Sequence, residues 1–208
     1  MKILLTAFEP FGGETVNPSL EAAKDVPGRI GEAGIVLRTV PVTFAGAADA
    51  VIRAVRSERP DAVLCLGQAG GRAALTPERV AINLDDARIP DNAGACPKEQ
   101  PIDPDGPAAY FSRLPVRAMA ERIRSAGVSA EVSCTAGTFV CNHLMYALLR
   151  WIDTEAPELA GGFMHVPYLD EQTKDRPGVP SLPREEITRG IAAALEAIAE
   201  SLAVRKGR

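Results

Sequence analysis

The sequence predicts a single α/β domain, with a mostly parallel sheet that has helices on both of its faces. Short apolar runs typical of buried strands alternate along the chain with longer segments whose apolar residues have helical spacing. The run at 62–66 (AVLCL) is apolar at every position, as expected of a strand in the middle of a parallel sheet. No linker, repeat or low-complexity segment divides the chain, so the predicted domain spans residues 1–208.

The individual elements follow from apolar pattern and from turn residues. Strands are predicted where short apolar runs are bounded by turn residues, at 2–6, 35–42, 62–66, 130–134 and 162–166, with a further extended segment at 79–84. Helices are predicted where the spacing is helical, at about 20–24, 44–56, 116–125, from Thr138 to about Trp151, and at 185–204. The Pro-rich and Gly-rich segments at 85–107 and 167–183 are expected to be loops, and loops this long are usually functional or mobile.

Composition excludes several classes of function. The net charge is −4, which gives no reason to expect nucleic acid or an anionic membrane as a partner. The first apolar run is too short for a signal peptide, and no run of about eighteen apolar residues is available to span a bilayer. Cys65, Cys96, Cys134 and Cys141 lie far apart, so reduced thiols in a cytoplasmic protein are expected. No CxxC or HxxxH pair supports a metal site, and no cofactor is expected.

The segment 135–146 (TAGTFVCNHLMY) carries the strongest chemical signal. It lies between a predicted strand and a predicted helix, and Thr138 has a hydroxyl suited to an N-cap. With Thr138 as the cap, Cys141 is the third helical residue, where unpaired amides and the helix dipole favour a thiolate. Cys141 is therefore a candidate nucleophile, the alternative being a small buried apolar residue.

A catalytic thiol needs a base, and the chain has only two histidines. His143 lies two residues after Cys141 on the same predicted helix, about 200° around its axis, so the two side chains cannot meet. His165 lies near the carboxyl end of a predicted strand, the edge of an α/β sheet where ligands bind. The predicted base is therefore His165. Spacing alone leaves four acids open as the group that orients the imidazole: Glu78, Asp85, Asp86 and Asp91.

Six blocks of sequence resemble the pyroglutamyl peptidase I family. They are 8–19 (FEPFGGETVNPS), 67–72 (GQAGGR), 77–83 (PERVAIN), 85–92 (DDARIPDN), 135–143 (TAGTFVCNH) and 165–168 (HVPY). This resemblance implies a cysteine exopeptidase, an omega-peptidase, that removes an N-terminal pyroglutamyl residue from peptides. It also implies an α/β/α sandwich with a mostly parallel, mixed sheet, a cytoplasmic location, no metal, and assembly as a homotetramer.

The resemblance implies roles for particular residues. The triad would be Glu78, Cys141 and His165, so Glu78 is selected where spacing could not choose. Arg88 would lie close to the thiol. A neutral lactam needs an apolar slot and a few polar contacts. By resemblance the slot would be walled by Phe8, Phe11, Ile89, Phe139 and Val140, and Gln68 in the glycine-rich turn is expected to make a polar contact. One departure from the family pattern is Cys134, where asparagine is expected; we predict a packed residue there.

Two other classes are compatible with the same residues. The first is a binding protein on this scaffold that performs no chemistry. The second is a thiol hydrolase that acts on other small amides.

Overall fold

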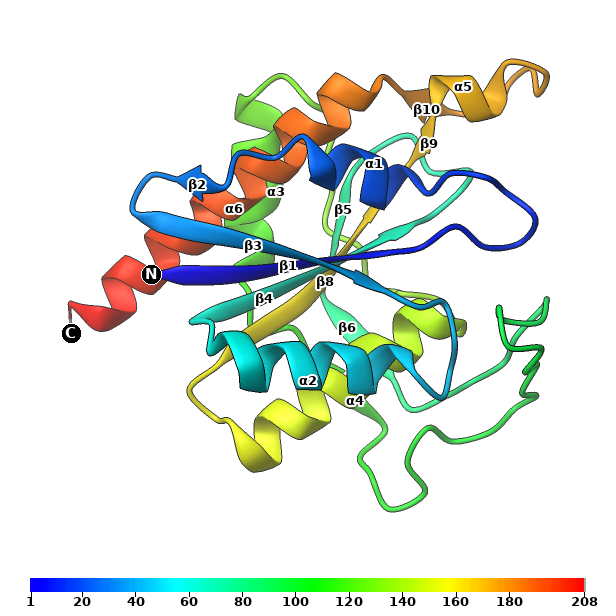
Figure 1. Cartoon of the computed structure of the whole chain (residues 1–208), viewed down its shortest axis with the longest axis horizontal. Helices are drawn as coiled ribbons and strands as arrows, with labels where there is room; N and C mark the ends of the chain where they lie inside the picture. The colour runs from blue at the N-terminus through cyan, green and yellow to red at the C-terminus, as the bar shows by residue number, and fades with distance from the viewer. Residues whose placement is uncertain (208) are drawn as a thin grey trace.

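The computed structural model describes residues 1–207 and has one six-stranded sheet at its centre (Figure 1). The strand order is β2 (Arg29–Ile30), β3 (Ala33–Val40), β1 (Lys2–Phe8), β4 (Ala62–Gln68), β8 (Ala160–Val166) and β5 (Thr76–Glu78). The four inner strands are parallel to one another, and the edge strands β2 and β5 pair antiparallel to their neighbours. The predicted fold class, with a mostly parallel mixed sheet, is confirmed.

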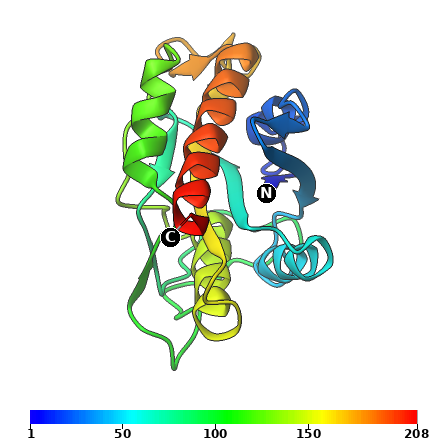
Figure 2. The ribbon, with the colours of Figure 1, turned by 90° about the vertical axis from the view of Figure 1, so that its left-hand side faces the viewer.

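Helices cover both faces of this sheet (Figures 1 and 2). One face carries α1 (Pro18–Lys24), α3 (Val116–Ser125) and α6 (Arg184–Lys206), and the other carries α2 (Ala47–Glu58) and α4 (Val140–Glu155). Figure 2 shows α3 and α6 side by side over their face. The buried residues form two apolar clusters, one on each side of the sheet, so the sheet is the middle layer of three. None of the helices in residues 1–207 combines the length and apolarity needed to cross a bilayer.

Smaller elements complete the described chain. Strands β6 (Val80–Ile82) and β7 (Ala109–Phe111) form an antiparallel pair, and β9 (Tyr168–Leu169) pairs in parallel with β10 (Ser181–Leu182). Helix α5 (Asp170–Thr173) follows β9 directly. The segment 167–183 is therefore not the uninterrupted loop that its prolines suggest.

One predicted strand is absent from residues 1–207, and one observed strand was not predicted. Residues 130–134 do not form a strand but run beside β5, making only the isolated bridges Leu75 to Ala130 and Glu78 to Ser133. In turn, β5 is an element that the sequence did not predict. It is three residues long and contains Pro77, so it has too little apolar pattern to be recognised.

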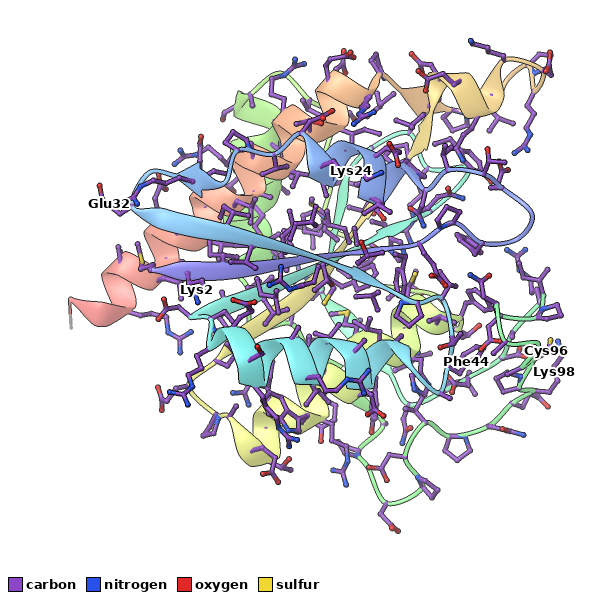
Figure 3. The ribbon with its side chains drawn as sticks, viewed as in Figure 1. Lys2, Lys24, Glu32, Phe44, Cys96 and Lys98 are labelled. Carbon is purple, nitrogen blue, oxygen red and sulfur yellow. The ribbon has the colours of Figure 1, made fainter. Side chains whose placement is uncertain are left out.

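The loop at 85–107 is irregular, as predicted, but hydrogen bonds to Asp91 hold part of it in place. The Asp91 carboxylate accepts hydrogen bonds from the amides of Phe44, Ala93 and Ala95, at 2.8 to 2.9 Å. Figure 3 shows Cys96 and Lys98 on this loop at the same side of the molecule as Phe44, with Lys2 and Glu32 toward the opposite end of the sheet. This side is the carboxyl edge of the parallel strands, where α/β proteins place their ligands.

Candidate active site

A cavity of about 680 Å³ opens at the carboxyl edge of the sheet. Its wall includes both Cys141, at the start of α4, and His165, near the end of β8. Loops that follow β1 and β4 supply further parts of the wall, among them Phe11 and Gly70. The fold thus brings the two predicted reactive side chains, from elements far apart in sequence, into one hollow of a size typical for small-ligand sites.

Cys141 lies one position nearer to the helix start than predicted. The N-cap of α4 is Phe139, whose side chain makes no capping hydrogen bond, and Cys141 is the second helical residue. Thr138 does not cap the helix because its hydroxyl donates to the carbonyl oxygen of Asp86, at 2.8 Å. The amide of Asp86 in turn donates to the carbonyl of Thr138, at 2.9 Å, so Thr138 fastens the loop at 85–107 to the helix start.

The position of Cys141 at the helix start is not by itself enough to lower the pKa of its thiol below the ordinary value. Burial raises the pKa of the Cys141 thiol to about 12, and the negative charge of Glu78 adds to this rise. The guanidinium of Arg72 and the backbone amide of Cys141 itself act in the opposite direction but are outweighed. These surroundings favour the neutral thiol, so attack by the sulfur needs a base to take its proton.

His165 is buried and held between two neighbouring strands. It pairs with Gly67 of β4 on one side and with Thr76 of β5 on the other. Its Nδ1 lies 2.7 Å from Oε1 of Glu78, at hydrogen-bond distance. The bond fixes the imidazole and leaves Nε2 as the nitrogen available for proton transfer.

Gly67 explains how the sulfur fits beside this histidine. A Cβ atom built on Gly67 would lie only 2.9 Å from Cys141 Sγ, so the sulfur occupies the space that a side chain would take there. Paired residues on adjacent strands lie about 5 Å apart, and Gly67 is the strand partner of His165. Cys141 Sγ is therefore no more than about 8 Å from the Cβ atom of His165, within reach of the imidazole.

Glu78 is completely buried on β5 and contacts two cationic or potentially cationic groups. Burial by itself would raise the pKa of its carboxyl, but hydrogen bonds with His165, Ser133 and Arg72 and the charge of His165 outweigh burial and hold that pKa below its ordinary value. Glu78 is thus a carboxylate in the fold. Of the four acids that spacing left open, it is the one bonded to His165.

The remaining histidine lies elsewhere, as the helix geometry predicted. His143 Nδ1 is 2.7 Å from Oδ2 of Asp85, and its ring packs edge-on against Phe44 with centroids 5.6 Å apart. It lines a separate, smaller hollow between α2 and α4. Asp85 therefore contacts His143 instead of His165, and the Asp91 carboxylate contacts backbone amides.

Most of the predicted substrate-binding residues line the cavity that contains Cys141. Those on its wall are Phe11, Gln68, Arg88, Ile89 and Phe139. Phe11 and Phe139 face each other with ring centroids 6.1 Å apart. Two expectations fail at this level: Phe8 packs on Phe163 in the core, and Val140 is fully buried, so both lie behind the wall. Cys134 is also unlike its prediction, being exposed instead of packed.

Two further wall residues had no predicted role. Arg72 lies within the GQAGGR block and Tyr168 within the HVPY block, so both were in segments singled out from the sequence. Tyr168 packs its ring directly over Gly70, where a Cβ atom would come within 2.2 Å of it. The contact of Tyr168 with Gly70 could not be predicted, because it joins segments that are distant along the chain.

A thiol, an imidazole and a buried carboxylate at the carboxyl edge of an α/β sheet are the groups that a cysteine hydrolase requires. Comparison with known proteins narrows this class. The sequence model of the family described as pyroglutamyl peptidase matches residues 1–201. The chain belongs to this family, and the predicted cysteine-type pyroglutamyl peptidase activity is confirmed as that of the family.

Individual relatives agree over nearly the whole chain. The pyrrolidone-carboxylate peptidase of Levilactobacillus brevis is 56% identical over 198 residues, covering 95% of this chain and 97% of that protein. One from Streptococcus pyogenes is 55% identical, covering 96% and 93%. The fold matches the crystal structure of Bacillus amyloliquefaciens pyroglutamyl peptidase I with a TM-score of 0.92 and 46% sequence identity, covering 96% of this chain and 97% of that one. A mutant pyrrolidone carboxyl peptidase from Pyrococcus furiosus also scores 0.92, at 39% identity and 97% and 100% coverage.

Proposed function

We propose that this chain cleaves the amide bond after an N-terminal pyroglutamyl residue, with Cys141 as nucleophile, His165 as general base and acid, and Glu78 as the group that orients His165. The assignment depends on one observation. Nδ1 of His165 lies 2.7 Å from Oε1 of Glu78, and His165 lines the same cavity as Cys141. The raised pKa of Cys141 gives the base a definite task, since the thiol must lose its proton as it attacks.

The proposed reaction proceeds in two halves. In the first, Nε2 of His165 takes the proton of the Cys141 thiol while Sγ bonds to the pyroglutamyl carbonyl carbon. The C–N bond then breaks, and the imidazolium gives its proton to the departing amine, which leaves a thioester. In the second half, His165 takes a proton from water as the oxygen attacks the thioester. The C–S bond then breaks, the imidazolium returns its proton to Sγ, and the products are 5-oxoproline and the free thiol. Ionised Glu78 stabilises the imidazolium that forms in both halves.

The oxyanion of each half is proposed to lie at the amino end of α4. The first amides of a helix have no partner within the helix and point outward. The backbone amide of Cys141 is among them, and it already lowers the pKa of its own sulfur, which places a donor close to the reacting atom. Each oxyanion donor of this kind contributes about 3–4 kcal/mol to transition-state stabilisation in other acyl-transfer enzymes.

The substrate ring is proposed to bind against Phe11, Ile89 and Phe139. A pyroglutamyl group has no free amine and no charge, so it needs apolar contact for its methylenes and neutral hydrogen bonds for its lactam. Gln68 offers an amide at the wall, and its Oε1 accepts a hydrogen bond from Gln172 at 3.3 Å, which leaves donor capacity on Gln68. Arg88, also on the wall, is proposed to polarise the scissile carbonyl.

Location and assembly are part of the same proposal. We infer a cytoplasmic homotetramer whose partners are peptides with an N-terminal pyroglutamate, and neither nucleic acid nor membrane. The absence of disulfide-forming cysteine spacing, the modest net charge and the family resemblance support this. Sedimentation equilibrium of the purified protein tests the assembly, and a mass of one chain at micromolar concentration would contradict it.

The deciding experiment compares cleavage of pyroglutamyl, prolyl and alanyl fluorogenic amides by the wild-type protein, by Cys141→Ala and by Cys134→Ser. The expected result is cleavage of the pyroglutamyl amide alone, its loss in Cys141→Ala, and its retention in Cys134→Ser, whose thiol is exposed outside the cavity wall. Retention of ligand without cleavage by the wild-type protein indicates a binding protein instead. Equal cleavage of all three amides indicates a less selective thiol hydrolase.

A further inference from the structure

Arg72 donates three hydrogen bonds beside the proposed catalytic groups. Its Nη1 donates to Oε1 of Glu78 at 2.6 Å and to the hydroxyl of Thr76 at 2.5 Å. Its Nη2 donates to the carbonyl oxygen of Thr135 at 2.8 Å. The same side chain forms part of the cavity wall. One guanidinium therefore connects β5 with the turn that leads to Cys141.

The oxygen that Arg72 contacts is the one that His165 uses. Oε1 of Glu78 lies 2.7 Å from Nδ1 of His165 and 2.6 Å from Nη1 of Arg72. Thr76, the other Arg72 partner on β5, is the strand partner of His165. Arg72 thus contacts both the strand partner of His165 and the carboxylate that β5 presents to the imidazole.

The electrostatics give this contact a reason beyond packing. Glu78 is completely buried, and a buried carboxylate without a cationic partner takes up a proton instead of remaining charged. A neutral Glu78 could not stabilise an imidazolium. The side chain of Arg72 is 27% exposed, so the guanidinium keeps part of its hydration while it contacts the buried carboxylate.

We propose that Arg72 is a positioning residue of the reaction: it helps to keep Glu78 ionised and fixes its Oε1 toward His165. This inference rests on the proposed function, because it acts through Glu78 and His165. Arg72 is given no direct role in bond making or breaking.

The test uses Arg72→Met, Arg72→Lys and a matched control, Arg113→Met. Arg113 also binds one carboxylate, that of Asp153 at 2.6 Å, and one backbone carbonyl, that of Pro157 at 2.7 Å. Its side chain is 30% exposed, and it lies away from the cavity wall. It therefore loses similar contacts on substitution without touching the proposed triad.

We expect Arg72→Met to lower kcat about tenfold or more, with KM changed by less than about twofold. The loss is smaller than the roughly 10²–10⁴-fold contribution of a general acid–base group itself, because Arg72 acts only through Glu78. The acid limb of its kcat/KM profile moves to higher pH, because Glu78 takes up a proton more readily. Arg72→Lys keeps a positive charge but lacks the planar fork, so it restores the position of the limb while part of the loss in kcat persists. Arg113→Met should match the wild type in both measurements.

A double-mutant cycle separates this role from a structural one. If Arg72 acts through Glu78, adding Arg72→Met to a Glu78→Gln variant changes kcat by less than about twofold. Additive losses, or an Arg72→Met profile that superimposes on the wild type, would overturn the inference. Each kcat is normalised to the fraction of protein that is folded, from urea unfolding, and to the fraction with a titratable Cys141 thiol. If Arg72→Met does not fold, Arg72→Lys provides the comparison.

The two levels of proposal fail in different ways. Wild-type kcat in Glu78→Gln overturns the triad assignment and with it the role of Arg72. An impaired Glu78→Gln together with an Arg72→Met variant that behaves like Arg113→Met overturns the role of Arg72 alone.

Discussion

The sulfur of Cys141 lies where a side chain of Gly67 would be, 2.9 Å from the Cβ position of that glycine. The same position would be 2.8 Å from Cζ of Phe163, so residue 67 is closed on two sides. Because Gly67 is also the strand partner of His165, the absence of a side chain there is what lets a helix from one face bring its thiol to a strand-borne imidazole.

Gly67→Ala should therefore impair the reaction more than the fold. The added methyl group forces Cys141 or Phe163 to move, which we expect to lower kcat at least tenfold while costing about 1–3 kcal/mol of unfolding free energy. Gly28→Ala is the matched control, since a Cβ atom at Gly28 meets nothing within 4 Å. Activity assays and urea unfolding measure the two effects. Equal activity of both variants would show that the close contact has no bearing on catalysis.

The raised pKa of Cys141 predicts how its alkylation depends on pH. Because burial raises that pKa to about 12, the reactive thiolate fraction in the free enzyme keeps increasing across the neutral and mildly alkaline range. The rate of iodoacetamide addition to Cys141, followed by mass spectrometry of its peptide, should still be rising at pH 9. Cys96 and Cys134, both exposed, serve as internal references. A plateau already reached near pH 7 would instead indicate a thiolate–imidazolium pair before substrate binds.

Glu78 should make stability depend on pH on the acid side. Its folded pKa lies below the ordinary value of 4.5, so the unfolded chain takes up the proton more readily. The contribution of the ionised group is thus present above about pH 4.5 and is lost as the pH falls through the folded pKa. We expect the difference in urea midpoint between wild type and Glu78→Gln to be largest near neutrality and to shrink toward pH 3.

The control for this measurement is Glu158→Gln, a substitution of an exposed glutamate. Its midpoint should stay close to that of the wild type over the whole range. A Glu78→Gln deficit that is the same at pH 7 and pH 3 would mean that Glu78 contributes through shape and hydrogen bonding instead of through its charge.

His143→Gln should weaken the fold without stopping the reaction. The substitution removes a 2.7 Å contact with Asp85 and an edge-on contact with the Phe44 ring, both outside the cavity that contains Cys141. A hydrogen bond to a buried charged group contributes about 1.5–3 kcal/mol, so we expect a loss of that order in the free energy of unfolding. The kcat, corrected for folded protein, should remain within about twofold of the wild type. A collapse of kcat in fully folded protein would contradict the separation of the two histidines.

The long elements could be predicted because local pattern decides them. The helix at Val116–Ser125 was predicted with the bounds that α3 has, and the apolar runs in β1, β4 and β8 were recognised as strands. Short elements could not be predicted in this way. β5 has three residues and a proline, and it is a strand only because β8 offers it hydrogen-bond partners. Thr138 was a plausible cap by residue type, but Asp86, distant in sequence, accepts its hydroxyl.

The sequence by itself determined the α/β class, and it predicted the candidate nucleophile and, through the geometry of a helix turn, which of two histidines could serve it. Tertiary structure alone decided the rest. Glu78 and His165 are 87 residues apart, and their bond, the contact of Arg72 with the same oxygen and the burial that raises the Cys141 pKa exist only once the sheet is assembled. The physical reason is that side-chain charge and ionisation depend on which groups surround an atom in space, and spacing along the chain fixes those neighbours only within one helix or strand.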